Sequence, residues 1–396
     1  MAAQRIEEPR KEVKLYFKII ILLVTLVLAF LGGREFYELR HFKETFVSSP
    51  GLTEVKMLSD YLPSLKGTWI DTPIFVYDSG VPGGTVLYMA NVHPYEPAAS
   101  LSAYILMENI KVKKGKVFVL PQGNRSASTT GMLANAYPKF FHIKTSFGEK
   151  KFRIGDRGTN PLDQWPDPFT YVHYPSRQNL AYQDIRNMNR TYPGRANGTL
   201  TERASFAIME LIRKEKIDLS IDVHEASLMY PVVSTYVAHE RSFDIAMMAA
   251  MTLTATSFDM KCESSPKSLR GLSHREWGDF SDTLPVLMET PEPFIDRVVG
   301  PMTEELFTEG KDEFLAVAAK HGLTYVPYTL DFGSPLWYRC GRHLSGALEV
   351  INQINQFMPE KEVIVEWPTY DQLKEHDCGF FFHDPAKADQ KLVFKI

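Results

Sequence analysis

Cysteine is scarce in this sequence, and neither sign of charge dominates it. Three cysteines among 396 residues are too few and too scattered for a disulfide scaffold or a cysteine-built zinc site. The formal net charge of −4 leaves no basic surplus for a phosphate backbone, so nucleic-acid binding is not expected. Internal repeats and low-complexity tracts are also lacking. What remains is an ordinary globular composition, 44% hydrophobic, in a chain long enough for one large domain or two to three smaller ones.

One long hydrophobic run lies near the N-terminus, between Leu15 and Gly33. Its length is close to the ~20 apolar residues that a membrane-spanning helix needs, and it carries a single charge, Lys18. We expect an uncleaved transmembrane anchor over residues 14–33. A cleaved signal peptide is the alternative, although the end of the run is a poor cleavage site. Basic residues are more frequent before the run than after it, which favours a single-pass protein with the bulk of the chain on the extracytoplasmic side.

The rest of the chain divides by pattern. Short apolar runs alternate with helical periodicity between residues 67 and 322, which predicts an α/β domain with a mixed, mostly parallel sheet and helices on both faces. The remaining expected parts are an N-terminal tail (1–13), a charged stalk (34–66) and a C-terminal extension or small domain (323–396). A segment rich in proline and aromatic residues, 132–182, is typical of a functional loop or a covering insertion.

Polar residues of a catalytic type follow four predicted strands. Ligands in open α/β sheets bind beyond the carboxyl ends of the strands, so these residues should converge although 196 positions separate His93 from Glu289. The residues are His93 and Glu96 after strand 85–90, Asn124 and Arg125 after 117–120, His224 and Glu225 after 219–223, and Glu289 after 285–288.

Three of these side chains have the chemistry of a metal site. The H-x-x-E spacing of His93 and Glu96, in a turn that leaves a strand, lets an imidazole and a carboxylate face one ion. His224, at the end of its own strand, would be the third ligand. Two histidines and one carboxylate are a known catalytic zinc set with a fourth position open, so we expect one Zn²⁺ per chain. Other divalent metals are an alternative occupant.

A second motif lies between Asp184 and Gly194 and contains Asn189-Arg190. A guanidinium binds a carboxylate bidentately, so Arg190 with the Asn189 amide suits a substrate that has a free carboxylate. The alternative is a polar turn that caps the helix expected to begin near Thr201.

In this order, the motifs resemble those of the M14 zinc carboxypeptidases, especially their succinylglutamate desuccinylase/aspartoacylase branch. The resemblance covers about residues 70–300. It rests on H-x-x-E at 93–96, N-R-x-[FY]-P-G at 189–194, Asp-Val-His at 222–224 and Leu-Met-Glu-Thr at 287–290.

The resemblance implies a role for each matching residue. His93, Glu96 and His224 would be the zinc ligands, and Asn189 and Arg190 would hold the substrate carboxylate. Glu289 would be the general base that deprotonates the attacking water and then protonates the leaving amine.

The family also uses an arginine upstream of the N-R pair to polarise the scissile carbonyl, and here the match is poor. Arg177 is the expected residue, with Arg125 and Arg186 as alternatives, because the 132–182 insertion blurs the alignment. Asp222 shares a strand face with His224 and could support it, whereas Glu225 faces the other way and is not expected to be a ligand.

The expected function is that of a membrane-anchored, zinc-dependent deacylase that cleaves the amide bond of an N-acyl amino acid. The 128 positions between Glu96 and His224 are closer to the peptidase members, so a metallocarboxypeptidase acting on peptides or cell-wall peptides is the alternative. A non-enzymatic, membrane-tethered binding protein on the same fold is the alternative of another class. The sequence gives no indication of oligomeric state.

Overall fold

The computed structural model describes residues 11–132, 137–295, 297 and 300–396, and it divides at Phe42/Lys43 into two units. The first unit contains the helix α1 (Lys11–His41). This helix is long and apolar enough to cross a membrane, a property that an N-terminal signal sequence shares. The helix continues through the first residues of the expected stalk and ends at His41.

An eight-stranded sheet forms the centre of the second unit, in the order β13-β12-β14-β11-β4-β6-β3-β2. The four central strands, β14, β11, β4 and β6, are parallel to one another. Antiparallel pairs join them to β12 on one side and β3 on the other, which confirms the predicted mixed, mostly parallel sheet. The strands are β2 (Glu54–Met57), β3 (Pro73–Asp78), β4 (Thr85–Met89), β6 (Lys116–Leu120), β11 (Leu219–Ser227), β12 (Thr235–Ala238), β13 (Lys261–Ser264) and β14 (Leu284–Glu292).

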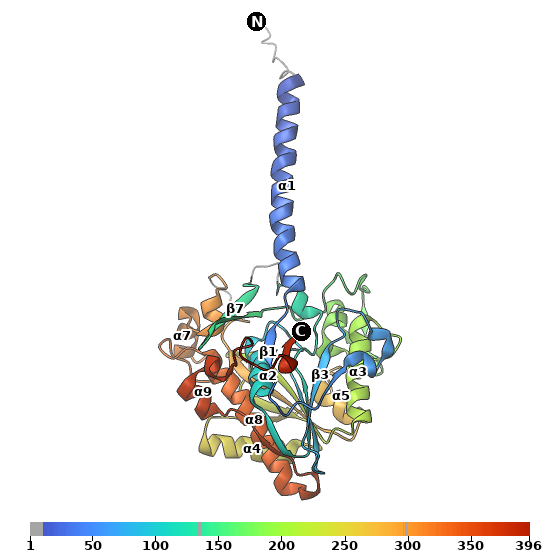
Figure 1. Cartoon of the computed structure of the whole chain (residues 1–396), viewed down its shortest axis with the longest axis vertical. Helices are drawn as coiled ribbons and strands as arrows, with labels where there is room; N and C mark the ends of the chain where they lie inside the picture. The colour runs from blue at the N-terminus through green and yellow to red at the C-terminus, as the bar shows by residue number, and fades with distance from the viewer. Residues whose placement is uncertain (1–10, 133–136, 296, 298–299) are drawn as a thin grey trace, which may run out of the picture. The chain divides into compact units, whose positions relative to one another are not determined.

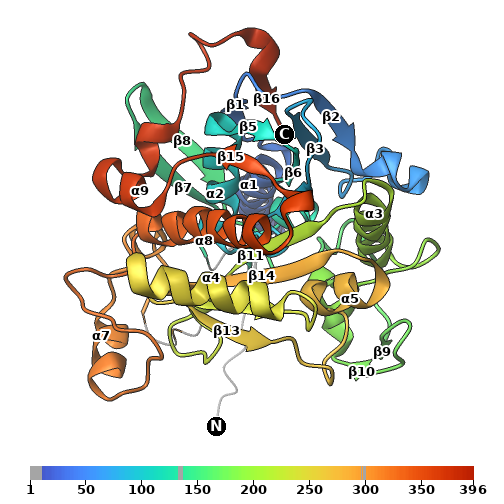
Figure 2. The same ribbon diagram turned by 90° about the horizontal axis from the view of Figure 1, so that it is seen from below.

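Helices cover both faces of this sheet, because its central strands are apolar on both sides. In β4, Val86 and Tyr88 belong to one buried cluster, and Leu87 and Met89 belong to another. The first cluster includes α2 (Pro97–Asn109), α4 (Phe243–Thr256) and α8 (Leu336–Phe357), and α4 and α8 lie side by side (Figure 2). The second includes α3 (Leu200–Lys214) and Trp277 of α5 (Ser273–Phe280).

The boundaries of this unit differ from the expected ones at both ends. Strand β1 (Thr45–Val47) pairs with β16 (Val393–Lys395), so the chain's C-terminal end lies beside residues expected in the stalk (Figure 1). Strand β2, also in the expected stalk, pairs with β3 in the main sheet. Helix α8 packs on that sheet, and β15 (Ile364–Glu366) pairs with β5 (Lys111–Lys114). Residues 43–66 and 323–396 are therefore built into the same unit as the predicted catalytic residues.

The expected insertion, in its described part, contains two hairpins. They are β7 (Phe140–Thr145) with β8 (Gly148–Arg153), and β9 (Tyr171–Val172) with β10 (Asn179–Leu180). The smaller helices α6 (Glu304–Thr308), α7 (Glu313–Lys320) and α9 (Tyr370–His376) complete the unit.

Candidate metal and substrate site

The turn after β4 brings His93 and Glu96 together. Asn91 adopts a positive φ of 63°, a conformation that asparagine tolerates, and the chain reverses there. Helix α2 then begins at Pro97. Proline is favourable at the first helical position, because a backbone N–H there would have no partner within the helix. Glu96 is thus fixed as the residue before the helix, and its Oε1 lies 2.8 Å from His93 Nδ1.

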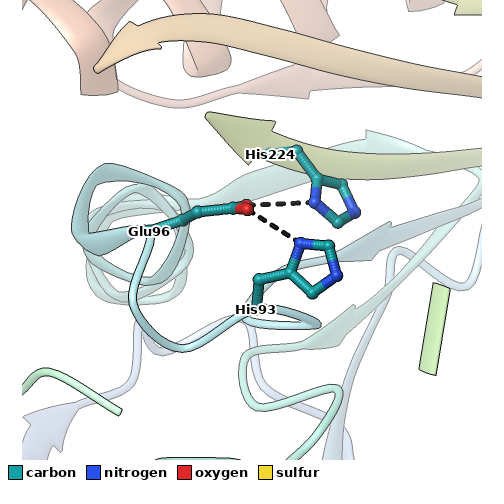
Figure 3. Close-up of side chains that lie close together, drawn as sticks. All are labelled: His93, Glu96 and His224. Atoms are coloured by element: carbon teal, nitrogen blue, oxygen red, sulfur yellow. Dashed lines mark hydrogen bonds and ion pairs between the residues drawn. The ribbon is translucent and has the colours of Figure 1, made fainter. Parts of the chain in front are cut away.

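His224 completes the group from the neighbouring strand β11. Its Nδ1 lies 3.0 Å from Glu96 Oε2, so both imidazoles present Nδ1 to one carboxylate (Figure 3). One donor atom from each of the three residues lies within 4.8 Å of the others, and all three side chains are buried. The structure therefore brings the three expected ligands into one group.

A hydrogen bond on the far side of His93 sets the protonation of its imidazole. Asn187 Oδ1 accepts from the backbone N–H of Asn189 at 3.0 Å, which identifies this atom as the oxygen. His93 Nε2 lies 3.0 Å from the same oxygen and must donate to it, which leaves Nδ1 as the lone-pair nitrogen of the neutral ring. Burial lowers the pKa of His93 and favours this neutral form.

Asp222 lies behind His224 as an ion-pair partner. Its Oδ2 lies 3.0 Å from His224 Nε2 and also accepts a hydrogen bond from Ser273 Oγ. A carboxylate behind a histidine is the usual support of a zinc ligand, so two imidazole nitrogens and one carboxylate with these partners fit a zinc ion.

Glu289 lies on β14, directly across from His224 in the parallel register. Its Oε2 is buried and has no hydrogen-bond partner among the described residues. Burial raises the pKa of this carboxyl to about 8, with Glu96 and Asp222 adding to the rise and His224 opposing it. A carboxyl with a pKa near neutrality can both accept and return a proton.

The Asn189-Arg190 pair lies in a short 3-10 turn before α3. Asn189 Oδ1 accepts from the Ser273 N–H at 2.8 Å, so the Nδ2 amino group is left as a donor. Gly194 closes the turn at φ 72°, where a Cβ atom would lie 2.2 Å from the Glu202 carbonyl oxygen. Both the close approach and the backbone conformation therefore require glycine at this position of the motif.

One cavity of about 420 Å³ collects these groups. Its lining includes His93, Glu96, Asn189, Arg190 and Glu289. Arg190 forms no ion pair with a carboxylate in the part of the chain that the structure describes. His224 does not line the cavity itself but contacts Glu96, which does.

The cavity also contains an arginine that the sequence analysis missed, Arg157. Among the described residues, this exposed guanidinium likewise has no carboxylate partner within ion-pair distance. It reaches the site because Gly155 crosses the His93–Glu96 turn, where the Gly155 N–H donates to Pro94 O at 3.0 Å. A Cβ atom at Gly155 would lie 2.5 Å from Pro94 Cβ, so the glycine two residues before this arginine was the available signal.

The arginines expected in its place lie elsewhere. Arg177 lines a separate cavity of about 890 Å³ with residues of the β9 region. Arg125 donates to Asp71 O at 2.9 Å, and Arg186 pairs with Asp167 at 2.9 Å. None of the three lines the cavity that contains Glu289. Among these four arginines, Arg157 alone lines that cavity.

No protein-family model and no curated protein matches the sequence. Among solved structures, a metallo-carboxypeptidase from Burkholderia cenocepacia matches with 10% identity and a TM-score of 0.45, covering 78% of this chain and 66% of that one. A succinylglutamate desuccinylase from Silicibacter matches with 15% identity and a TM-score of 0.32, covering 56% and 54%. The D,L-carboxypeptidase Csd4 of Helicobacter pylori matches with 10% identity and a TM-score of 0.40, covering 72% and 52%. The chain thus spans between about half and two thirds of the length of these proteins.

Proposed function

We propose that this chain is a zinc-dependent hydrolase that cleaves an amide bond in a small substrate with a free carboxylate, most simply an N-acyl amino acid. One observation carries this proposal. A single cavity is lined by His93 and Glu96 of the donor group, by Glu289 with its unpartnered carboxyl oxygen, and by guanidiniums with no carboxylate partner among the described residues. Cations without a protein counter-ion are suited to an anionic substrate.

Each group then has a separate task. His93, Glu96 and His224 would hold the zinc ion, which when bound lowers the pKa of water and polarises a carbonyl. Glu289 takes the proton of the attacking water and returns it to the leaving amine. Asn189 and Arg190 bind the substrate carboxylate and so fix the distance between it and the scissile bond.

Arg157 takes the role that the resemblance assigns to an upstream arginine. Its guanidinium lines the same cavity as Glu289 and can donate to the carbonyl oxygen, where negative charge develops during attack. We further propose that α1 anchors the protein in a membrane, with the catalytic unit on the extracytoplasmic side.

The test is hydrolysis by the full-length, zinc-loaded protein, assayed with N-acyl amino acids and with peptides that have free C-termini. Glu289→Gln should retain zinc and lose activity at least about 100-fold, since proton transfer contributes about 10²–10⁴ to such rates. Glu263→Gln, an exposed carboxylate on β13, is the matched control and should retain activity. Full activity of folded, zinc-loaded Glu289→Gln would overturn the mechanism, and the preferred substrate class would distinguish a deacylase from a peptidase.

A further inference from the structure

His274 lines the same cavity but has no part in the chemistry described so far. His274 follows Ser273, whose backbone N–H donates a hydrogen bond to Asn189 Oδ1. The first turn of α5 therefore lies next to Asn189 and Arg190, the pair proposed to bind the carboxylate. The side chain is 5% exposed, and among the described residues its Nε2 forms no hydrogen bond. Nε2 is also not one of the fully buried polar atoms that lack a partner, so this nitrogen is open to the cavity and available to a ligand there.

The neighbours of His274 determine which nitrogen carries the hydrogen. Its Nδ1 lies 2.7 Å from Ser265 Oγ, and the same oxygen lies 3.1 Å from Arg275 Nε. A guanidinium can only donate, so Ser265 Oγ accepts from Arg275, and among the described residues His274 Nδ1 is the remaining partner that can take the hydrogen of this hydroxyl. Nδ1 is then the acceptor, and in the neutral ring Nε2 carries the hydrogen.

The ring is held in this neutral form. Burial, reinforced by the charge of Arg275, lowers the pKa of His274 to about 3. Nε2–H is therefore an uncharged donor throughout the physiological pH range. The cavity already contains the charges of Arg157 and Arg190, so a neutral donor adds a hydrogen bond without further repulsion between cations.

We propose that His274 Nε2–H donates a hydrogen bond to the substrate carboxylate, as a third donor beside Asn189 Nδ2 and the Arg190 guanidinium. A carboxylate offers about four lone-pair sites, enough for a guanidinium fork and two further donors. The inference rests on the proposed function, because it takes Asn189 and Arg190 to be the carboxylate-binding pair.

The experiment measures binding without turnover. Full-length, zinc-loaded Glu289→Gln in detergent is titrated by calorimetry with N-acetyl-L-leucine and with its primary amide, which lacks the carboxylate. Two double variants are compared with it. His274→Phe keeps a ring and removes the donor, whereas His274→Gln places an amide N–H near the position of Nε2.

Loss of one hydrogen bond to a charged group should weaken binding of the carboxylate compound about 10- to 100-fold in the His274→Phe background. His274→Gln should restore most of this loss. The amide should bind weakly and equally to all three proteins, since it does not present the charged acceptor. Zinc content, which His274 does not contribute to, shows that each variant is folded.

Three results would overturn the inference: unchanged affinity in His274→Phe, an equal loss for the amide, or no binding of the carboxylate compound to the folded, zinc-loaded protein. Hydrolysis by the wild-type chain is measured separately and tests the proposed function. Carboxylate binding that depends on His274, without hydrolysis of any substrate, would uphold the inference and reject the reaction.

Discussion

The sequence favours Arg177 as the arginine that polarises the scissile carbonyl, whereas the structure favours Arg157. Replacing each of the two in turn tests which one has this role. Arg157 lines the cavity that holds His93 and Glu289, whereas Arg177 lines a different one. Among the described residues Arg157 has no carboxylate partner, so Arg157→Ala leaves no ionised group newly unpaired and should barely change stability. Its effect should fall on catalysis, because a donor to the developing oxyanion is lost.

The magnitude follows from that role. Removal of one such donor costs about 10²–10³ in kcat, or about 2.7–4 kcal/mol of transition-state stabilisation. We expect this loss in Arg157→Ala and a partial loss in Arg157→Lys, which keeps the charge but not the planar fork. Arg177→Ala should remain within about twofold of wild type.

The assay is steady-state hydrolysis of the best substrate from the screen, with urea unfolding to compare stabilities. A kcat loss confined to Arg177→Ala would refute the assignment of Arg157 and restore the sequence-based expectation. A large drop in the unfolding free energy of Arg157→Ala would show instead that the guanidinium has a structural role.

Three further changes test the supports of the site. His93→Ala combined with His224→Ala should abolish a zinc content of about one ion per chain in elemental analysis, while retained zinc would place the ion elsewhere. Arg339→Met should cost about 3–5 kcal/mol of unfolding free energy in urea, because it strands the buried carboxylate of Glu225, 2.6 Å away. Adding Glu225→Gln to Arg339→Met should recover part of that loss, and an additive effect would contradict the pairing. Asn187→Leu should weaken zinc binding about 10- to 100-fold in chelator competition, and the same variant should show a raised KM. Asn187→Asp keeps an acceptor and should retain zinc. An effect on zinc affinity alone, or on KM alone, would show that Asn187 does not link the two.

The sequence was sufficient for the metal group because its geometry is largely local. His93 and Glu96 share one turn, and His224 and Glu289 lie opposite each other towards the carboxyl ends of two neighbouring strands, β11 and β14, whose parallel order follows from the α/β pattern. Once the sheet forms, these side chains meet at its carboxyl edge without help from distant contacts.

Arg157 could not be found in the same way. Its position depends on a contact between Gly155 and Pro94, which are 61 positions apart and belong to no periodic pattern. The boundaries of the second unit could not be predicted from the sequence for a similar reason. Strands β1 and β16 have three residues each, too short for an alternating signal, and they pair across nearly the whole chain, Thr45 with Lys395.

The site therefore combines a rigid part and a part that is positioned by it. The metal group sits on the sheet edge, whereas Asn189 and Arg190 lie in a turn with little regular structure of its own. Asn187 joins the two, because its single Oδ1 accepts from His93 Nε2 and from the Asn189 backbone N–H. The atom that fixes the tautomer of a proposed metal ligand thus also fixes the turn that we propose to bind the carboxylate. Correct placement of the metal group and correct spacing to the substrate carboxylate are consequently one structural requirement in this chain, and a change in either should appear in both.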